Sequence, residues 1–368
     1  MRETIKSQHI SGLKGIACLA VMVGHFAGII KYTTSAEIDL AEFSFLSSPP
    51  FGVLFNESFW LYLFFLASGF LLALGKIESL SMLIQKIFRR FLRLGIPVLF
   101  ASAGIYLIWI FMGMHNAATD SLFVNRWYQN AYNCSASVVD VLLSPIHVLI
   151  LEKNIFNSPY WVLRDMFAAS VLIYLCLYVQ SKVSKWCWAN YIVAYGGALL
   201  SCLFSEIVAA CVIGFVLAQH RHHVKWFMKK VKWLGGVAII IFIGCATLYP
   251  NPLSAVLLFG AIILLTPSFP KLDSLLSNLF LVRLEKISFG IYSFHWPVVC
   301  SVGGYILLTV WNHGAIWAFL LCGIASSFIT ILFSCFFGIT AERATSYIIK
   351  NAMNAFSLVI TNRLHTKK

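Results

Sequence analysis

Long runs of apolar residues alternate with short polar segments along most of the chain. Runs of about 17–25 apolar residues are long enough to cross a bilayer as helices. We predict ten such spans, several of them short: 10–30, 55–74, 92–113, 160–179, 187–204, 205–219, 233–249, 252–267, 287–310 and 315–338. Only helices and closed barrels satisfy their backbone hydrogen bonds in lipid, and these runs lack the apolar–polar alternation of barrel strands. The pattern therefore predicts an all-α, polytopic membrane protein with about ten transmembrane helices.

The composition agrees with a chain that is embedded in lipid. Of its 368 residues, 60% are hydrophobic and 11% are charged, whereas soluble domains average about 45–50% apolar and about 25% charged residues. The mean hydropathy is +0.84. These values exclude a water-soluble enzyme, and the shortage of charge also excludes a disordered chain.

The net charge of +13 indicates membrane orientation rather than nucleic-acid binding. With ten spans, 22 of the 27 basic residues fall in segments on one side of the membrane and three fall on the other. Cytoplasmic loops carry the excess of Lys and Arg, so we predict that both termini are cytoplasmic and that nucleic acid is not a partner. We predict one transmembrane domain over residues 1–345 and a basic cytoplasmic tail over residues 346–368. The segment 138–151 is expected to dip into the membrane without crossing it.

Two ionisable residues, Lys14 and His25, stand in the first predicted span. Ionisable side chains at membrane depth are costly and point to function. Eleven residues at about 100° each bring both side chains to one helix face, about 16 Å apart along the axis. That separation suits the two ends of one bound molecule, with the neutral imidazole accepting a hydroxyl proton. The alternative is that Lys14 extends to the cytoplasmic interface and that His25 is hydrogen-bonded within the bundle.

A basic cluster of Arg89, Arg90 and Arg93 opens the third predicted span from the cytoplasm. Residues three apart share a helix face, and guanidinium groups bind phosphate through paired hydrogen bonds. The cluster is therefore a candidate phosphate site. The alternative is an ordinary basic flank that contacts anionic lipid.

Three further residues in predicted spans are candidates for chemistry. Asp165 is the only acid that stands away from the ends of a predicted span, and it lies beside Arg164 about 7 Å inside the outer boundary by helix rise. It is the natural partner to orient a buried histidine, although the two charges can also neutralise each other within the bundle. His295 is expected near the midplane, with His25 nearer the outer side. The run HRHH at 220–223 makes poor tetrahedral geometry, so we predict no metal site.

Together these segments resemble the acyltransferase-3 family of bacterial integral-membrane acyltransferases, which usually modify cell-surface sugars. The resemblance covers about residues 8–345. It rests on the order and spacing of Lys14-x10-His25, FFLASGF in the second span, Arg90-x-x-Arg93, Trp161-x3-Asp165 and ISFGIYSFHWPVV in the ninth span. Lys14 stands where Arg is commoner in the family, and Asp165 stands where Glu is commoner. Many relatives carry a C-terminal SGNH-type domain, which is not expected here because about 30 residues follow the last predicted span.

The resemblance implies a donor, an acceptor and a location. The donor is acyl-CoA, commonly acetyl-CoA, and the location is the bacterial inner membrane. The acceptor is a hydroxyl of a surface glycan, such as lipopolysaccharide O-antigen, capsule or exopolysaccharide, in free or lipid-linked form. Glycan and membrane lipids are thus the expected partners.

The resemblance also implies roles for the candidate residues. The phosphates of CoA would be held by Arg89, Arg90, Arg93 and Lys14. His25 would act as a general base or as a transient acyl carrier, and Asp165 would orient it. His295 or Arg164 would stabilise the developing oxyanion.

A proton-coupled polytopic transporter of an anionic or sugar-linked lipid is the competing hypothesis. Basic residues on one side and buried His and Asp also suit a carrier. The two halves of the chain show neither a repeat nor a shared pattern of broken helices, which favours the enzyme. A purified carrier would show neither thioester hydrolysis nor acyl transfer.

Overall fold

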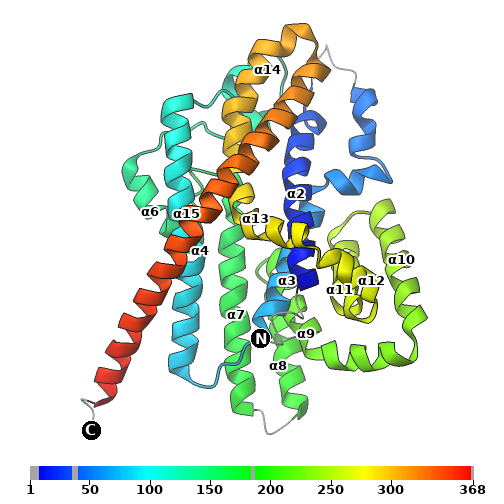
Figure 1. Ribbon diagram of the computed structural model, residues 1–368, viewed down its shortest axis with the longest axis vertical. Coiled ribbons are helices and arrows are strands. Elements are labelled where there is room, and N and C mark those ends of the chain that lie inside the picture. Colours follow the sequence, from blue (N-terminus) through cyan, green and yellow to red (C-terminus); the bar gives the residue numbers. More distant parts are fainter. Residues whose placement is uncertain (1–7, 35–39, 184–186, 366–368) are drawn as a thin grey trace.

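Helices form almost all of the regular structure in the computed structural model (Figure 1). The structure describes residues 8–34, 40–183 and 187–365. Residues 1–7, Lys185 and residues 366–368, which hold part of the predicted cytoplasmic charge, lie outside the described residues. Within the described ranges, strand pairing is limited to an isolated antiparallel bridge between Thr34 and Val124. The prediction of an all-α fold is confirmed.

Each of the ten predicted spans coincides with helix. The helices are α2 (Gln8–Lys31), α3 (Glu57–Leu72), α4 (Leu80–Met112), α7 (Trp161–Val183), α8 (Cys187–Ser201), α9 (Glu206–Lys230), α10 (Lys232–Leu248), α11 (Pro252–Leu265), α13 (Leu279–Val298) with its continuation through η6 (Val299–Gly303) and α14 (Gly304–Val310), and α15 (Ala315–His365). Shorter elements connect them: η1 (Leu40–Leu46), η2 (Phe51–Phe55), η3 (Ala117–Ser121), α5 (Arg126–Gln129), α6 (Val138–Leu149), η4 (Ser158–Tyr160), η5 (Thr266–Ser268), α12 (Pro270–Leu276) and η7 (Trp311–His313).

Several of these helices are long and apolar enough to cross a membrane. Within the described residues there are six: Gln8–Lys31, Leu80–Met112, Ser158–Val183, Glu206–Met228, Leu279–His313 and Ala315–Phe356. A bent pair, Pro252–Ser268 with Pro270–Leu276 at 115°, is a seventh candidate. The apolar helices α3 and α10, with 16 and 17 residues, are shorter than the roughly 20 residues of a typical span. The protein is a polytopic membrane protein, while the count of ten spans and the cytoplasmic termini stay predictions.

Two helices begin earlier than the hydropathy pattern predicts. α4 begins at Leu80 rather than near residue 92, because the Ser79 side chain caps its first turn by accepting a hydrogen bond from Met82 N at 3.1 Å. α13 begins at Leu279 rather than near residue 287. The predicted boundaries follow the rise in hydropathy, whereas the helices extend further into amphipathic sequence. The charged residues that precede both predicted spans are therefore helical.

The last helix continues far beyond its predicted span of 315–338. α15 runs to His365 and so includes most of the segment predicted as a basic tail. In Figure 1 it runs obliquely from the upper right to the lower left, and it packs against α13 and α4. The division between domain and tail stays a prediction, but α15 links the two parts as one helix.

Close helix contacts form the centre of the bundle. α2 packs against α3 and α13, and α3 packs against α9. A Cβ atom at Gly69 of α3 would lie 1.7 Å from the Cys211 carbonyl oxygen, and one at Gly214 of α9 would lie 2.1 Å from that of Leu66. Small residues allow helix backbones to approach closely, so FFLASGF forms a packing contact. α4 packs against α6, α7 and α15. The helices that contribute residues to the main cavity described below are α2, α3, α4, α7, α13 and α15.

Candidate active site

Two histidines meet where α2 packs against α13. The ring centroids of His25 and His295 lie 4.9 Å apart, and His295 is fully buried. Nδ1 of His25 donates to the Val21 carbonyl oxygen at 2.8 Å, and Nδ1 of His295 donates to the Ile291 carbonyl oxygen at 3.0 Å. Because a carbonyl oxygen only accepts hydrogen bonds, Nδ1 carries the proton in both rings. The lone pair of each neutral imidazole is therefore on Nε2.

Two tryptophans frame this histidine pair. The indole of Trp127 stacks on His25 at 5.9 Å and 24°, and Trp296 meets the same ring edge-on at 5.8 Å. Trp127 belongs to the short helix α5, which follows Asn125. The Asn125 amide donates to the Ile29 carbonyl oxygen of α2 at 2.8 Å, which holds α5 against α2. Rigid aromatic neighbours of this kind fix the plane of the imidazole and exclude water from it.

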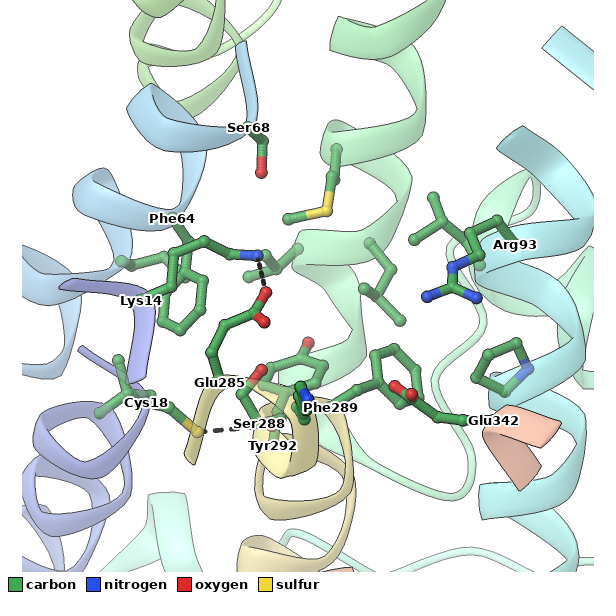
Figure 2. A pocket seen from close by; sticks show the side chains of 18 of the residues that line it. Lys14, Cys18, Phe64, Ser68, Arg93, Glu285, Ser288, Phe289, Tyr292 and Glu342 are labelled. Atoms are coloured by element: carbon green, nitrogen blue, oxygen red, sulfur yellow. Dashed lines mark hydrogen bonds and ion pairs between the residues drawn. The ribbon is translucent and has the colours of Figure 1, made fainter. Parts of the chain in front are cut away.

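His295 lines a cavity of about 350 Å³, which we call the charged cavity (Figure 2). Its Lys, Arg and Glu side chains, four basic and two acidic, are Lys14, Arg90, Arg93, Lys286, Glu285 and Glu342. Lys14 Nζ donates to Glu285 Oε1 at 2.6 Å. Figure 2 shows these two side chains pointing toward each other, with Arg93 and Glu342 on the opposite side of the view. The wall thus carries an excess of positive charge.

His25 lines a second cavity of about 450 Å³, which we call the aromatic cavity. Its other polar and aromatic walls include Tyr32, Glu57, Ser58, Trp127 and Trp161. Glu57 Oε2 lies 3.8 Å from Lys31 Nζ, and that amine also donates to the Phe55 carbonyl oxygen at 2.7 Å. Four residues line both this cavity and the charged one: Val21, Leu61, Val162 and Tyr292. The two cavities therefore meet beside the histidine pair.

A third cavity of about 630 Å³ lies between α4, α7 and α15, and we call it the basic cavity. Among the described residues that line it, five are basic and none is acidic: Lys86, Arg89, Arg90, Arg93 and Lys350. Arg90 and Arg93 also line the charged cavity. Arg90 Nε donates to Ser170 Oγ of α7 at 3.0 Å, which orients its guanidinium. The basic and charged cavities thus share a wall of two arginines.

Six of the eight residues that the sequence singled out line one of these cavities. The charged cavity has Lys14, Arg90, Arg93 and His295, the aromatic cavity has His25, and the basic cavity has Arg89 together with Arg90 and Arg93. The prediction that Lys14 and His25 share one helix face is consistent with this arrangement, because α2 presents the two residues to two cavities that share a wall. The chemical roles of these residues remain predictions.

Arg164 and Asp165, the other two candidates, do not lie with these six residues. Asp165 is buried, and it accepts a hydrogen bond from Ser205 Oγ, which precedes α9, at 2.8 Å. Arg164 forms an ion pair with Glu152 and lies 3.5 Å from Asp165. In the described part of the chain neither residue lines any of the three cavities. The α7 residues that line the charged cavity are Val162, Leu163 and Met166 instead.

Three residues of the site were missed by sequence reasoning. Glu285 was assigned to a cytoplasmic flank because the predicted span began two residues later. Glu57 was counted as an outer-loop acid, and Trp127 as part of a loop. One signal was available for Glu285: a lysine within a span requires an opposite charge, and Glu285 stands at the start of another apolar run. No local pattern marks Glu57 or Trp127 as neighbours of His25.

Comparison with known proteins gives one match. A family model described as an acyltransferase domain matches residues 8–338. Neither the curated proteins nor the solved structures include a significant match to this chain. The matched region contains α2 through most of the apolar part of α15, and with it the histidine pair and the aromatic cavity. It also contains the residues that line the charged cavity except Glu342 and Thr345.

Proposed function

The chain belongs to the acyltransferase 3 family, whose model matches residues 8–338, and from this premise we propose that it is an O-acyltransferase of the bacterial inner membrane. It moves an acyl group, acetyl in the first instance, from acyl-CoA to a hydroxyl of a cell-surface glycan. Lipopolysaccharide O-antigen, capsule and exopolysaccharide are the acceptor classes. In this proposal ten spans cross the membrane and both termini are cytoplasmic.

The observation that carries the proposal is the series of three cavities that leads to the histidine pair. The basic cavity shares Arg90 and Arg93 with the charged cavity, which in turn meets the aromatic cavity near His25 and His295. A donor with a phosphorylated end, a long uncharged arm and a terminal thioester fits such a series. An acceptor then approaches the same pair from the other side.

The donor side of the site suits the phosphates of CoA. Guanidinium groups bind phosphate oxygens through paired, charge-assisted hydrogen bonds. Arg89, Arg90, Arg93 and two lysines line the basic cavity, with no acidic side chain among its described lining residues. Lys14 is bound to Glu285, so we place it along the pantetheine arm rather than on a phosphate.

The acceptor side suits a sugar. Trp127, Trp161 and Tyr32 line the aromatic cavity, and aromatic side chains offer flat apolar faces with a polar edge against which a sugar ring can stack. Glu57 and Ser58 add acceptors for hydroxyl hydrogen bonds in the same wall. His25, with its lone pair on Nε2, then acts as the general base toward the hydroxyl. In this proposal the glycan approaches from the periplasmic side.

The proposal predicts chemistry that a carrier lacks. Purified protein in detergent, given radiolabelled acetyl-CoA and surface polysaccharide from cells without the protein, should release free CoA thiol and label the polysaccharide. In cells, mass spectrometry of the surface polysaccharide should show a two-carbon acyl increment that disappears when the protein is deleted. Failure of both assays, with labelled lipid or sugar crossing vesicle membranes instead, would establish the transporter.

A further inference from the structure

The two histidines of the site face different cavities. His295 lines the charged cavity and His25 lines the aromatic cavity, with their ring centroids 4.9 Å apart. We propose that acyl transfer proceeds in two half-reactions, in which Nε2 of His295 carries the acyl group and Nε2 of His25 deprotonates the acceptor hydroxyl. This inference rests on the proposed function and adds to it the identity of the acyl carrier.

Nε2 of His295 has the features of a nucleophile. The Nδ1 proton is committed to the Ile291 carbonyl oxygen, which leaves the lone pair on Nε2. This atom is buried and has no hydrogen-bond partner within the described residues. A lone pair in that state beside a cavity for the donor is poised for attack on a carbonyl carbon.

The local backbone holds His295 in position. Pro297 has no N–H, so the Ser293 carbonyl oxygen, one turn earlier, lacks its usual helical donor. The buried side chain of Asn157 replaces that donor, with a hydrogen bond of 3.1 Å from its Nδ2 to Ser293 O. A π-helical turn, Val299–Gly303, follows directly, and such turns are frequent at functional sites. A residue outside α13, Asn157, thus stabilises the helix around His295.

His25 has the features of the base for the second half-reaction. Its Nδ1 proton is committed to the Val21 carbonyl oxygen, so Nε2 is the atom that accepts a proton. Trp127 stacks on the ring, and the Glu57 carboxylate lines the same cavity. When His25 takes a proton, the nearby negative charge stabilises the imidazolium by Coulomb attraction.

The two steps balance. In the first, Nε2 of His295 attacks the thioester carbonyl carbon, the carbon–sulfur bond breaks, and CoA leaves as the thiolate, with a cationic acyl-imidazole on His295. In the second, the acceptor hydroxyl gives its proton to Nε2 of His25 while its oxygen attacks the acyl carbon. The bond to His295 breaks and the ester forms. The released thiolate takes up a proton from water and His25 returns its proton to water, which gives CoA thiol and restores both neutral rings.

The alternative mechanism is a direct, one-step transfer from donor to acceptor. In that mechanism, donor and acceptor must be present together, and His295 is a neighbour that is never acylated. The two mechanisms differ in one measurable reaction, the exchange of the CoA group of acetyl-CoA with free CoA in the absence of any acceptor. Only an acyl carrier supports this exchange.

The test therefore follows radiolabelled CoA into acetyl-CoA, with the full chain in detergent and no glycan present. We expect exchange by the wild type. His295→Gln should lower it at least about 100-fold, as loss of a catalytic nucleophile does. His25→Gln should lower transfer to the polysaccharide by about 10²–10⁴-fold while exchange stays within about threefold. His147→Gln is the matched control, since His147 is also buried and lines none of the three described cavities.

The outcomes distinguish transfer in two steps from transfer in one. Transfer by the wild type without exchange would overturn the carrier, because it establishes a one-step mechanism. Exchange that survives in His295→Gln, or that is lost in His25→Gln, would overturn the assignment of roles. The wild-type exchange does not depend on how any variant folds. Absence of both exchange and transfer in the wild type would instead count against the proposed function.

Discussion

Two pairs of charged or polar side chains join helices of this protein and serve different ends. Lys14 and Glu285 join α2 to α13 at 2.6 Å and line the charged cavity. Asp165 of α7 is joined at 2.8 Å to Ser205, the capping residue of α9, and in the described structure it lines none of the three cavities. Both pairs contain a charge in an apolar helix. The comparison teaches that the surroundings of such a charge, rather than its depth, separate ligand binding from helix packing.

The largest effect on activity is expected for a substitution where the charged and aromatic cavities share a wall. His25→Ala should lower acyl transfer by about 10²–10⁴-fold, because it removes the general base, while membrane insertion and the melting temperature stay close to wild type. Transfer of radiolabelled acetyl groups to polysaccharide is the measurement. A His25→Ala protein that is inserted and transfers at the normal rate would eliminate the mechanism.

The next largest effect is expected for a substitution in the wall that the basic and charged cavities share. Arg90→Ala/Arg93→Ala should raise the KM for acetyl-CoA by at least about 100-fold, since each of the two arginines loses a charge-assisted hydrogen bond that contributes about 1.5–3 kcal/mol. Arg126→Ala is the control, because Arg126 is exposed and pairs with Asp120 at the surface. An unchanged KM in the double variant would mean that the two arginines do not hold the donor.

A smaller effect is expected where the cavity wall is itself an ion pair. Glu285→Gln leaves Lys14 without its carboxylate, and the pair is only 20% and 25% exposed. We expect a loss of about 1–2 kcal/mol in stability, less than the roughly 3–5 kcal/mol of a fully buried pair. The melting temperature in detergent reports this loss. Lys14→Gln/Glu285→Gln, which removes both charges, should recover most of it, and no recovery would show that the pair is not coupled.

The smallest effect on activity is expected at the pair formed by Asp165 and Ser205. Asp165→Asn and Ser205→Ala should each leave acyl transfer within about threefold of wild type and lower stability by about 1 kcal/mol, through a lost hydrogen bond or helix cap. Transfer assays and thermal melting are read side by side. If Asp165→Asn abolished transfer at an unchanged melting temperature, the comparison would fail, and the role in orienting a histidine that the sequence predicts would return.

The helices of the fold were predictable from the sequence, and their ends were not. Continuous apolar runs select helix because no other open structure satisfies its backbone in lipid, and all ten runs are helical. The start of α4 at Leu80 depends on a cap at Ser79, a local hydrogen bond that hydropathy does not register. The length of α15 similarly exceeds its apolar run.

Prediction of the site from the sequence is limited in a similar way. The register of Lys14 and His25 follows from helix periodicity alone, and the two residues do line connected cavities. The partner of Lys14 is 271 positions away, and Trp127 reaches His25 from a four-residue helix. Contacts of this kind depend on how helices pack, which a single sequence does not reveal. For the same reason the hydrogen bond from Ser205 to Asp165 was not predicted, and the role of Asp165 in orienting a histidine stays a prediction.

The wall that α15 contributes to the basic cavity has one further consequence. The family match ends at residue 338, yet Ser346, Ile349, Lys350 and Met353 line that cavity opposite α4. A ligand held there contacts two helices at once, so part of its binding free energy fastens α15 to α4. By thermodynamic reciprocity, an event that pulls α15 away weakens the ligand by the same amount. The end of this helix is therefore a place where affinity for the donor can be tuned from a distance, with neither histidine disturbed.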